Sequence, residues 1–203
     1  MRLRHSVCAI SMIAALSALF LVSDSGAETA PDTPEPDPVW IEDWASETID
    51  LPPDFAPDMP AGVEKLRFAP GWRDPDSENF WSYVIVMWID EPIADSQRVT
   101  ELLEIYYDGL LSVFAHKKFG EVSIKPAQVV TQRIGPNRFK ARMHLIDAFA
   151  TFEPIELSVL VETAVVSEAS STVRIRVSSQ PTEHRIWESM EAAVHEISEN
   201  SDL

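Results

Sequence analysis

The chain changes its hydrophobic period several times, and each change marks a different element. Residues 80–90 are almost all aromatic or β-branched, which predicts a strand buried on both faces. After Gly120 apolar and polar residues alternate, as is typical of strands with one buried face. Two hairpins are predicted there, residues 127–134 with 138–146 and residues 155–166 with 172–178.

Two helices are predicted from apolar residues at helical spacing. The first can be capped by Asp95 or Ser96, and its apolar residues recur from Val99 to Phe114. Gly109 lies inside it at a cost of ~1 kcal/mol against alanine, which indicates a kink or a close contact. The second lies near the C-terminus, and its apolar side contains Ile186, Trp187, Met190, Val194 and Ile197. This order predicts an α+β fold, in which a curved antiparallel sheet of about five to six strands carries two packed helices.

The N-terminus has the order of regions that a secretory signal peptide needs. A basic start is followed by an apolar run from Val7 to Val22 and then by small residues up to Ala27. The run is shorter than the ~20 residues of a spanning helix, although an uncleaved membrane anchor is the alternative. Residues 1–27 are therefore predicted to be a Sec-type signal peptide cleaved near Ala27, and the protein to be periplasmic or secreted.

Two proline-rich segments follow the predicted cleavage site. Residues 28–38 alternate proline with acidic side chains and have almost nothing to bury, which predicts a disordered tether. Residues 39–76 keep the prolines but add aromatic side chains, and we expect an ordered wrap with a short strand near Glu64–Phe68. An aromatic ligand groove is the alternative for this segment. Residues 39–203 are thus predicted to form a single α+β domain.

Charge and cysteine content narrow the possible partners. The 203-residue chain has a net charge of −17, and cleavage would remove two basic residues and one acidic residue, which leaves −18. A field of this sign repels nucleic acid and anionic membrane surfaces, so neither is expected as a partner. Cleavage would also remove Cys8, the one cysteine, so the mature fold must rest on an ordinary core. No later apolar run is long enough to give a membrane span after cleavage.

Basic residues gather on two of the predicted strands. Arg138, Lys140, Arg142 and His144 alternate with apolar residues on one strand, and Arg174 and Arg176 do the same on the last strand. Strand geometry places each set on one face of the sheet. The functional hypothesis is a site for an anionic group, either a small ligand or the acidic surface of a partner protein. The alternative is cross-strand pairing with glutamates of the strand between them, Glu156 and Glu162.

Two further functions remain open on the sequence alone. Asp90 and Glu91 end the buried strand and Asp147 follows another, so these carboxylates could do the acid–base work of a hydrolase if they met. A carrier that holds a small apolar ligand between sheet and helix is the other possibility. The chain has no nucleophile elbow, zinc-protease motif or phosphate-binding glycine loop, and a role without catalysis is therefore favoured.

Two patterns resemble metal sites without fitting one. The last helix carries a polar stripe made of His184, Glu188, Glu191 and His195. Ligands spread over three turns of one helix cannot converge on a single ion. The stretch Asp74–Glu78 spaces its carboxylates like a calcium loop, but it lacks the glycine of the turn and the distant glutamate. No metal and no other cofactor is therefore predicted.

One part of the chain has a recognisable pattern. The segments LPPDFAP from Leu51, GVEKLRFAPG from Gly62 and FWSY from Phe80 resemble a signature of a group of exported bacterial proteins to which no activity is assigned. The order of elements is similar to that of the Mog1/PsbP-like fold, whose members are mostly accessory or binding proteins. The resemblance to the exported group implies no particular activity, and the lead hypothesis for this chain is an exported binding or accessory domain with no catalytic role.

Overall fold

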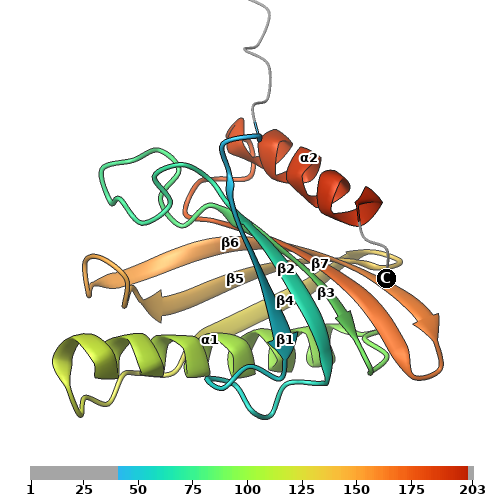
Figure 1. Ribbon diagram of the computed structural model, residues 1–203, viewed down its shortest axis with the longest axis horizontal. Coiled ribbons are helices and arrows are strands. Elements are labelled where there is room, and N and C mark those ends of the chain that lie inside the picture. The colour runs from blue at the N-terminus through green and yellow to red at the C-terminus, as the bar shows by residue number, and fades with distance from the viewer. Residues whose placement is uncertain (1–40, 201–203) are drawn as a thin grey trace, which may run out of the picture. The chain divides into compact units, whose positions relative to one another are not determined.

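Seven strands form one open antiparallel sheet, and a helix packs on each of its faces (Figure 1). The strand order is β1-β2-β3-β7-β6-β5-β4. The strands are β1 (Ala45–Leu51), β2 (Gly62–Phe68), β3 (Tyr83–Ile89), β4 (Gln128–Gly135), β5 (Arg138–Ile146), β6 (Pro154–Ser167) and β7 (Ser170–Ser178). The helices are α1 (Ser96–Phe119) and α2 (Ile186–Glu199). The predicted α+β class is confirmed, with seven strands in place of the five to six expected.

This computed structural model describes residues 41–200. The predicted signal peptide, its cleavage near Ala27 and the predicted tether 28–38 lie outside the described residues. The chain has one cysteine, so no disulfide can form within it. Within residues 41–200, neither helix has the length and apolar character that crossing a bilayer requires.

The additional strand, β1, lies in the proline-rich segment 39–76. Its residues are mostly polar and exposed, because it is an edge strand that pairs only with β2. The sequence therefore shows no apolar pattern at this position from which the strand could be predicted. The aromatic residues of the same segment pack on the protein's own core, as Phe55, Phe68 and Trp72 do against the α1 side of the sheet. An aromatic wrap over the sheet, and not an open groove, accounts for them.

The larger core lies between α1 and the sheet. Its largest fully buried side chains include Trp81, Tyr107, Phe139, Met143 and Leu157. The helix begins after Asp95, whose Oδ1 accepts a hydrogen bond of 2.9 Å from the backbone N–H of Arg98. A Cβ atom on Gly109 would lie 2.0 Å from the carbonyl oxygen of Phe55. The close contact predicted for this glycine is therefore confirmed, and its partner is the backbone that follows β1.

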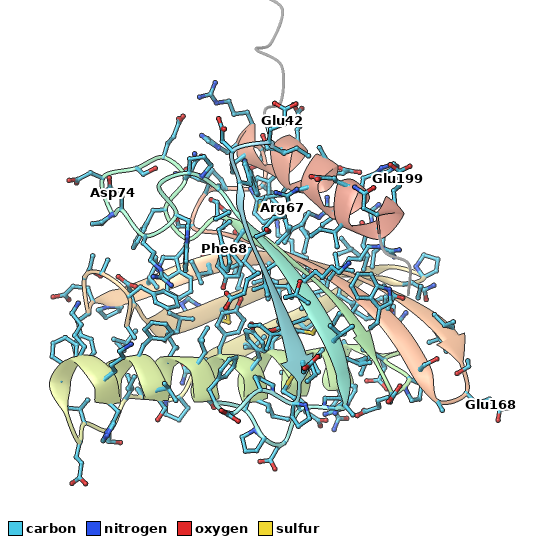
Figure 2. The ribbon with its side chains drawn as sticks, in the orientation of Figure 1. Glu42, Arg67, Phe68, Asp74, Glu168 and Glu199 are labelled. Carbon is cyan, nitrogen blue, oxygen red and sulfur yellow. The ribbon has the colours of Figure 1, made fainter. Side chains whose placement is uncertain are left out.

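A second, smaller core lies under α2. The residues that fill it include Trp44, Val84, Val86, Trp187 and Met190. The helix packs on β3 and β7, and Arg67 of β2 points toward it and forms an ion pair with Glu196 (Figure 2). α2 reaches the border of β6, where Leu160 packs against this core, and no helix among the described elements lies over the same face of β4 and β5. We call this uncovered half, on the α2 side of β4 and β5, the open face.

Candidate functional site

A row of four basic side chains crosses the open face along β5. Arg138, Lys140, Arg142 and His144 occupy alternate positions of this strand, and the intervening residues face the α1 core. The side chain of Arg142 is 68% exposed, that of Arg138 60% and that of His144 51%. We call these four residues the basic row. Successive members are ~7 Å apart and the whole row is ~20 Å long, as strand geometry requires.

The acidic residues that face the basic row come from β6. Glu162 lies 3.4 Å from Arg138, and Glu156 lies 3.9 Å from Arg142 and 3.4 Å from His144. Within the described part of the chain, Lys140 has no carboxylate in ion-pair range, and its Nζ lies 3.5 Å from the hydroxyl of Thr182. Two glutamates thus face three permanent cations, and Glu162 is also shared with β7. Exposed pairs of this kind contribute only ~0–1 kcal/mol, so an incoming anion can replace them.

The other neighbour of the basic row, β4, adds no negative charge. Its residues on the open face are Gln128, Val130 and Gln132, which lie opposite His144, Arg142 and Lys140. Val130 is 70% exposed, although it is apolar. The positive charge of the row is therefore compensated from one side only.

A small hollow ends the row at His144. Its volume is about 130 Å³, and Lys125, Gln128 and His144 line it together with four apolar residues, Pro126, Leu145, Ile146 and Pro154. Lys125 thus places a cation next to the last member of the row, in a space large enough for a carboxylate group. Lys125 was not predicted as a site residue, because it precedes β4 and belongs to no alternating pattern. The one sequence feature that could have indicated Lys125 is its place in the pair Lys125-Pro126, shortly before β4.

Arg174 and Arg176 lie on the same face of the sheet but under the flank of α2. The side chain of Arg176 is 8% exposed, and its guanidinium contacts Glu162 at 2.8 Å and Glu191 at 3.3 Å. Arg174 donates from Nε to the hydroxyl of Ser198 at 3.2 Å. Both side chains line a groove of about 360 Å³, together with three carboxylates. Arg176 thus contacts a carboxylate of β6 and one of α2, and Arg174 contacts α2, whereas the side chains of the basic row make no contact with this helix that the structure records.

The carboxylates considered for hydrolysis do not come together. Asp147 is fully buried and accepts hydrogen bonds from the indole N–H of Trp81 at 3.1 Å and from the backbone N–H and hydroxyl of Thr151 at 2.6 and 2.8 Å. It thereby fixes the turn after β5. Asp90 and Glu91 follow β3, which runs antiparallel to β5, so they lie at the opposite end of the sheet. The structure forms no acid–base pair from these residues.

A different carboxylate, Glu64, is buried in the α1 core. Its exposed fraction is 0%, and the hydroxyl of Tyr106 donates to its Oε1 at 3.0 Å. Its Oε2 has no hydrogen-bond partner among the described residues. Burial raises the pKa of Glu64 to about 7, the bond from Tyr106 opposes this effect, and the nearby Glu47 adds to it.

A pair of tyrosines lies beside this carboxyl. The hydroxyls of Tyr83 and Tyr107 are 2.5 Å apart, and burial raises the pKa of both. Burial of Glu64 was not predicted, although its position two residues before Leu66 places it on the inward face of β2. We interpret it as a carboxyl held within the core, protonated below pH 7, because the surrounding side chains are packed.

Three residues of the predicted polar stripe lie beside separate partners, and one of them, His184, precedes the first residue of α2. His184 lies 3.8 Å from Glu78, His195 lies 3.1 Å from Glu199, and Glu191 binds Arg176. In residues 41–200 no group of three or more potential ligands is placed to hold a metal ion.

The space in which a carrier would hold an apolar ligand is occupied by side chains. Between α1 and the sheet the fully buried residues Trp81, Tyr107 and Phe139 fill the core. No protein family, curated protein or solved structure matches the chain. The similarity to a group of exported proteins and to the Mog1/PsbP-like fold therefore stays an expectation, and the geometry of the open face carries the functional argument.

Proposed function

We propose that this protein is an exported, non-catalytic binding or accessory domain, and that it binds an anionic ligand on the open face through the basic row. The observation that carries the proposal is the position of α2, which covers one half of its sheet face and leaves the half with the basic row uncovered. A sheet face without a covering element is where a ligand or partner can lie.

The chemistry of the row supports an anionic ligand. Arginine presents a planar fork of donors that fits a carboxylate or phosphate in a bidentate manner, and lysine adds a compact charge. The row contains both, and Lys125 adds a cation at its end. The existing ion pairs with Glu156 and Glu162 are exposed, so exchanging them for a ligand costs little.

The negative net charge of the protein limits which anions can bind the basic row. At −17 the molecule repels polyanions at long range, whereas within ~8 Å of the row the local cations dominate at physiological salt. A ligand must therefore fit against the row closely to bind. The proposed location in the periplasm or outside the cell rests on the predicted signal peptide, and mass spectrometry of the mature N-terminus tests it.

A charge-matched pair of variants tests the site. The double variant K140Q/R142Q removes two cations of the row, and K117Q/K118Q removes two cations from the last turn of α1. The probe is a fluorescently labelled oligoglutamate, with oligogalacturonate as a second polyanion, and binding is measured by anisotropy at low and at physiological salt. We expect the row variant to bind about ten times more weakly, from the loss of two charge-assisted contacts, and the control to bind like the parent chain.

The outcome separates a site from general electrostatics. An equal loss in both variants would mean that binding follows net charge and not the row. If no polyanion binds the parent chain more tightly than the row variant, the proposed function is wrong. Thermal unfolding of both variants shows whether each has kept its fold.

A further inference from the structure

We propose that the ligand of the basic row is an extended peptide segment with acidic residues at alternate positions, which pairs with the outer edge of β4 as an additional strand. The inference rests on the proposed function and names the partner of that same site.

The outer edge of β4 is unpaired. β4 is the last strand of the sheet, and it hydrogen-bonds only with β5. Among the described residues, no backbone group of Gln128–Gly135 bonds to a loop or to a further strand. Every second residue of an edge strand directs its N–H and C=O outward, and this is the template that a peptide uses when it extends a sheet.

Over residues 128–132, β4 carries no charged side chain and no proline that would protect this edge. Its one charged residue, Arg133, bonds to the carbonyl of Ala94 and lies 4.7 Å from the centre of the Phe139 ring, so the charge is directed to the α1 side. Val130 is 70% exposed on the open face. The opposite edge, β1, carries the exposed acidic residues Glu47 and Asp50. These two carboxylates disfavour the pairing of an acidic segment with β1, whereas β4 presents no acidic side chain.

A bulge near the C-terminal end of β4 limits the length of edge that can pair with a peptide. The register between β4 and β5 shifts between Arg133 and Gly135, where a bulge twists the edge away. Residues 128–133 remain regular, and they can pair with a segment of about six residues.

The spacing of charges favours acidic residues at every second position of the added strand. Its open-face side chains would lie beside Gln128, Val130 and Gln132, and ~10 Å from the backbone of β5. Arginine, lysine and glutamate side chains are long enough to meet across these uncharged residues. In β5 and in the added strand, side chains on the same face follow one another every ~7 Å. Successive acidic side chains of the peptide therefore match successive members of the basic row.

Two other ligands would use fewer features of the β4 edge and the basic row. A carboxylated polysaccharide can satisfy the cations but offers no strand backbone to the edge. A second copy of the chain would join two uncharged edges and leave both basic rows without anions. The observations therefore favour an acidic peptide segment, and the other two are outcomes of the test.

The test uses the unaltered protein and a set of labelled peptides. The parent peptide of about eight residues alternates glutamate with valine or threonine. A second peptide has the same composition with its glutamates in one block. Two further peptides carry N-methyl groups on the odd or on the even residues, which removes the backbone donors of one edge at a time. Affinities are measured by anisotropy, and the mass of the free protein by light scattering.

We expect the alternating peptide to bind at least about ten times more tightly than the block peptide, and one N-methylated series to lose this advantage while the other keeps it. If all four peptides and oligogalacturonate bind equally, and K140Q/R142Q weakens them all, the proposed function stands and pairing with β4 is wrong. A stable dimer of the free protein that dissociates when peptide is added supports pairing at the edge of β4. A dimer that prevents the peptide from binding means that a second copy of the chain occupies this edge, and it overturns the proposal. If K140Q/R142Q changes no affinity, both proposals fail.

Discussion

The buried carboxyl of Glu64 makes a definite prediction about the pH dependence of stability. Its pKa of about 7 in the folded protein compares with an ordinary value of 4.5. Below pH 4.5 the carboxyl is neutral in both the folded and the unfolded chain, so its ionisation does not affect folding. As the pH rises above 4.5, the unfolded chain ionises first, and the free energy of unfolding decreases until the folded carboxyl also ionises near pH 7.

The magnitude follows from the same two values. At ~1.4 kcal/mol per pH unit, the interval from 4.5 to 7 corresponds to about 3 kcal/mol of lost stability. The substitution Glu64→Gln keeps the shape of the side chain and an acceptor for Tyr106, but it cannot ionise. We therefore expect the variant to match the parent chain below pH 4.5 and to be about 3 kcal/mol more stable at pH 8.

Urea unfolding between pH 4 and pH 8.5, followed by tryptophan fluorescence, measures this difference. Subtracting the two profiles cancels the titration of all other groups. The groups that face Glu64 are Tyr106, Tyr107 and Tyr83, whose raised pKa values keep them neutral over this range, and Glu47 of β1. Glu168→Gln is the control, because it removes a carboxyl from the exposed turn between β6 and β7 and Glu168 is not among the groups that shift the pKa of Glu64, so its difference profile should lack the fall between pH 4.5 and 7. Parallel profiles for the parent chain and Glu64→Gln would refute the argument, since they would mean that ionised Glu64 is accommodated without cost.

Three further substitutions test individual contacts. Tyr106→Phe removes the hydrogen bond that lowers the pKa of Glu64, so the pH-dependent loss of stability should extend to higher pH, and a titration by carboxyl NMR would record the shift. Gly109→Ala would place a Cβ atom 2.0 Å from the carbonyl oxygen of Phe55, and it should destabilise by about 1–3 kcal/mol in urea, although helix propensity alone predicts the opposite sign. Arg176→Met should cost about 1–2 kcal/mol, since its partners are partly exposed, and should lower the protection of α2 in hydrogen exchange; unchanged protection would contradict its role in attaching α2.

The sequence predicts most of the secondary structure, because nearly every element has a strong period. The hairpins and α1 could be identified from alternation and helical spacing alone. β1 could not, because an exposed edge strand has no buried face to impose a pattern. The strand predicted from residue 80 begins at Tyr83 in the structure, because Trp81 adopts a positive φ of 58° and turns its indole toward Asp147.

The candidate site shows a different limit. Alternation assigns Arg138, Arg142, Arg174 and Arg176 each to a face of its strand, and the pairing of β5, β6 and β7 brings them to one side of the sheet. The apolar stripe of α2 indicates that the helix packs, but not on which strands. That choice depends on contacts distant in sequence, such as Trp44 with α2. It decides that Arg174 and Arg176 are used in packing and that the basic row is left exposed.

The buried carboxyl of Glu64 and the basic row lie on opposite faces of the sheet and should act independently. Glu64 faces α1, whereas the basic row faces the α2 side of the sheet. Around Glu64, the α1 side of the sheet carries packed apolar side chains. Ionisation of Glu64 changes the stability of the folded chain but adds no charge to the open face. Glu64→Gln should therefore raise stability at pH 8 and leave the affinity for an acidic probe unchanged when the protein is folded. A change in affinity that follows the titration of Glu64 would show that the sheet transmits the charge, and that the open face cannot be considered apart from the core beneath it.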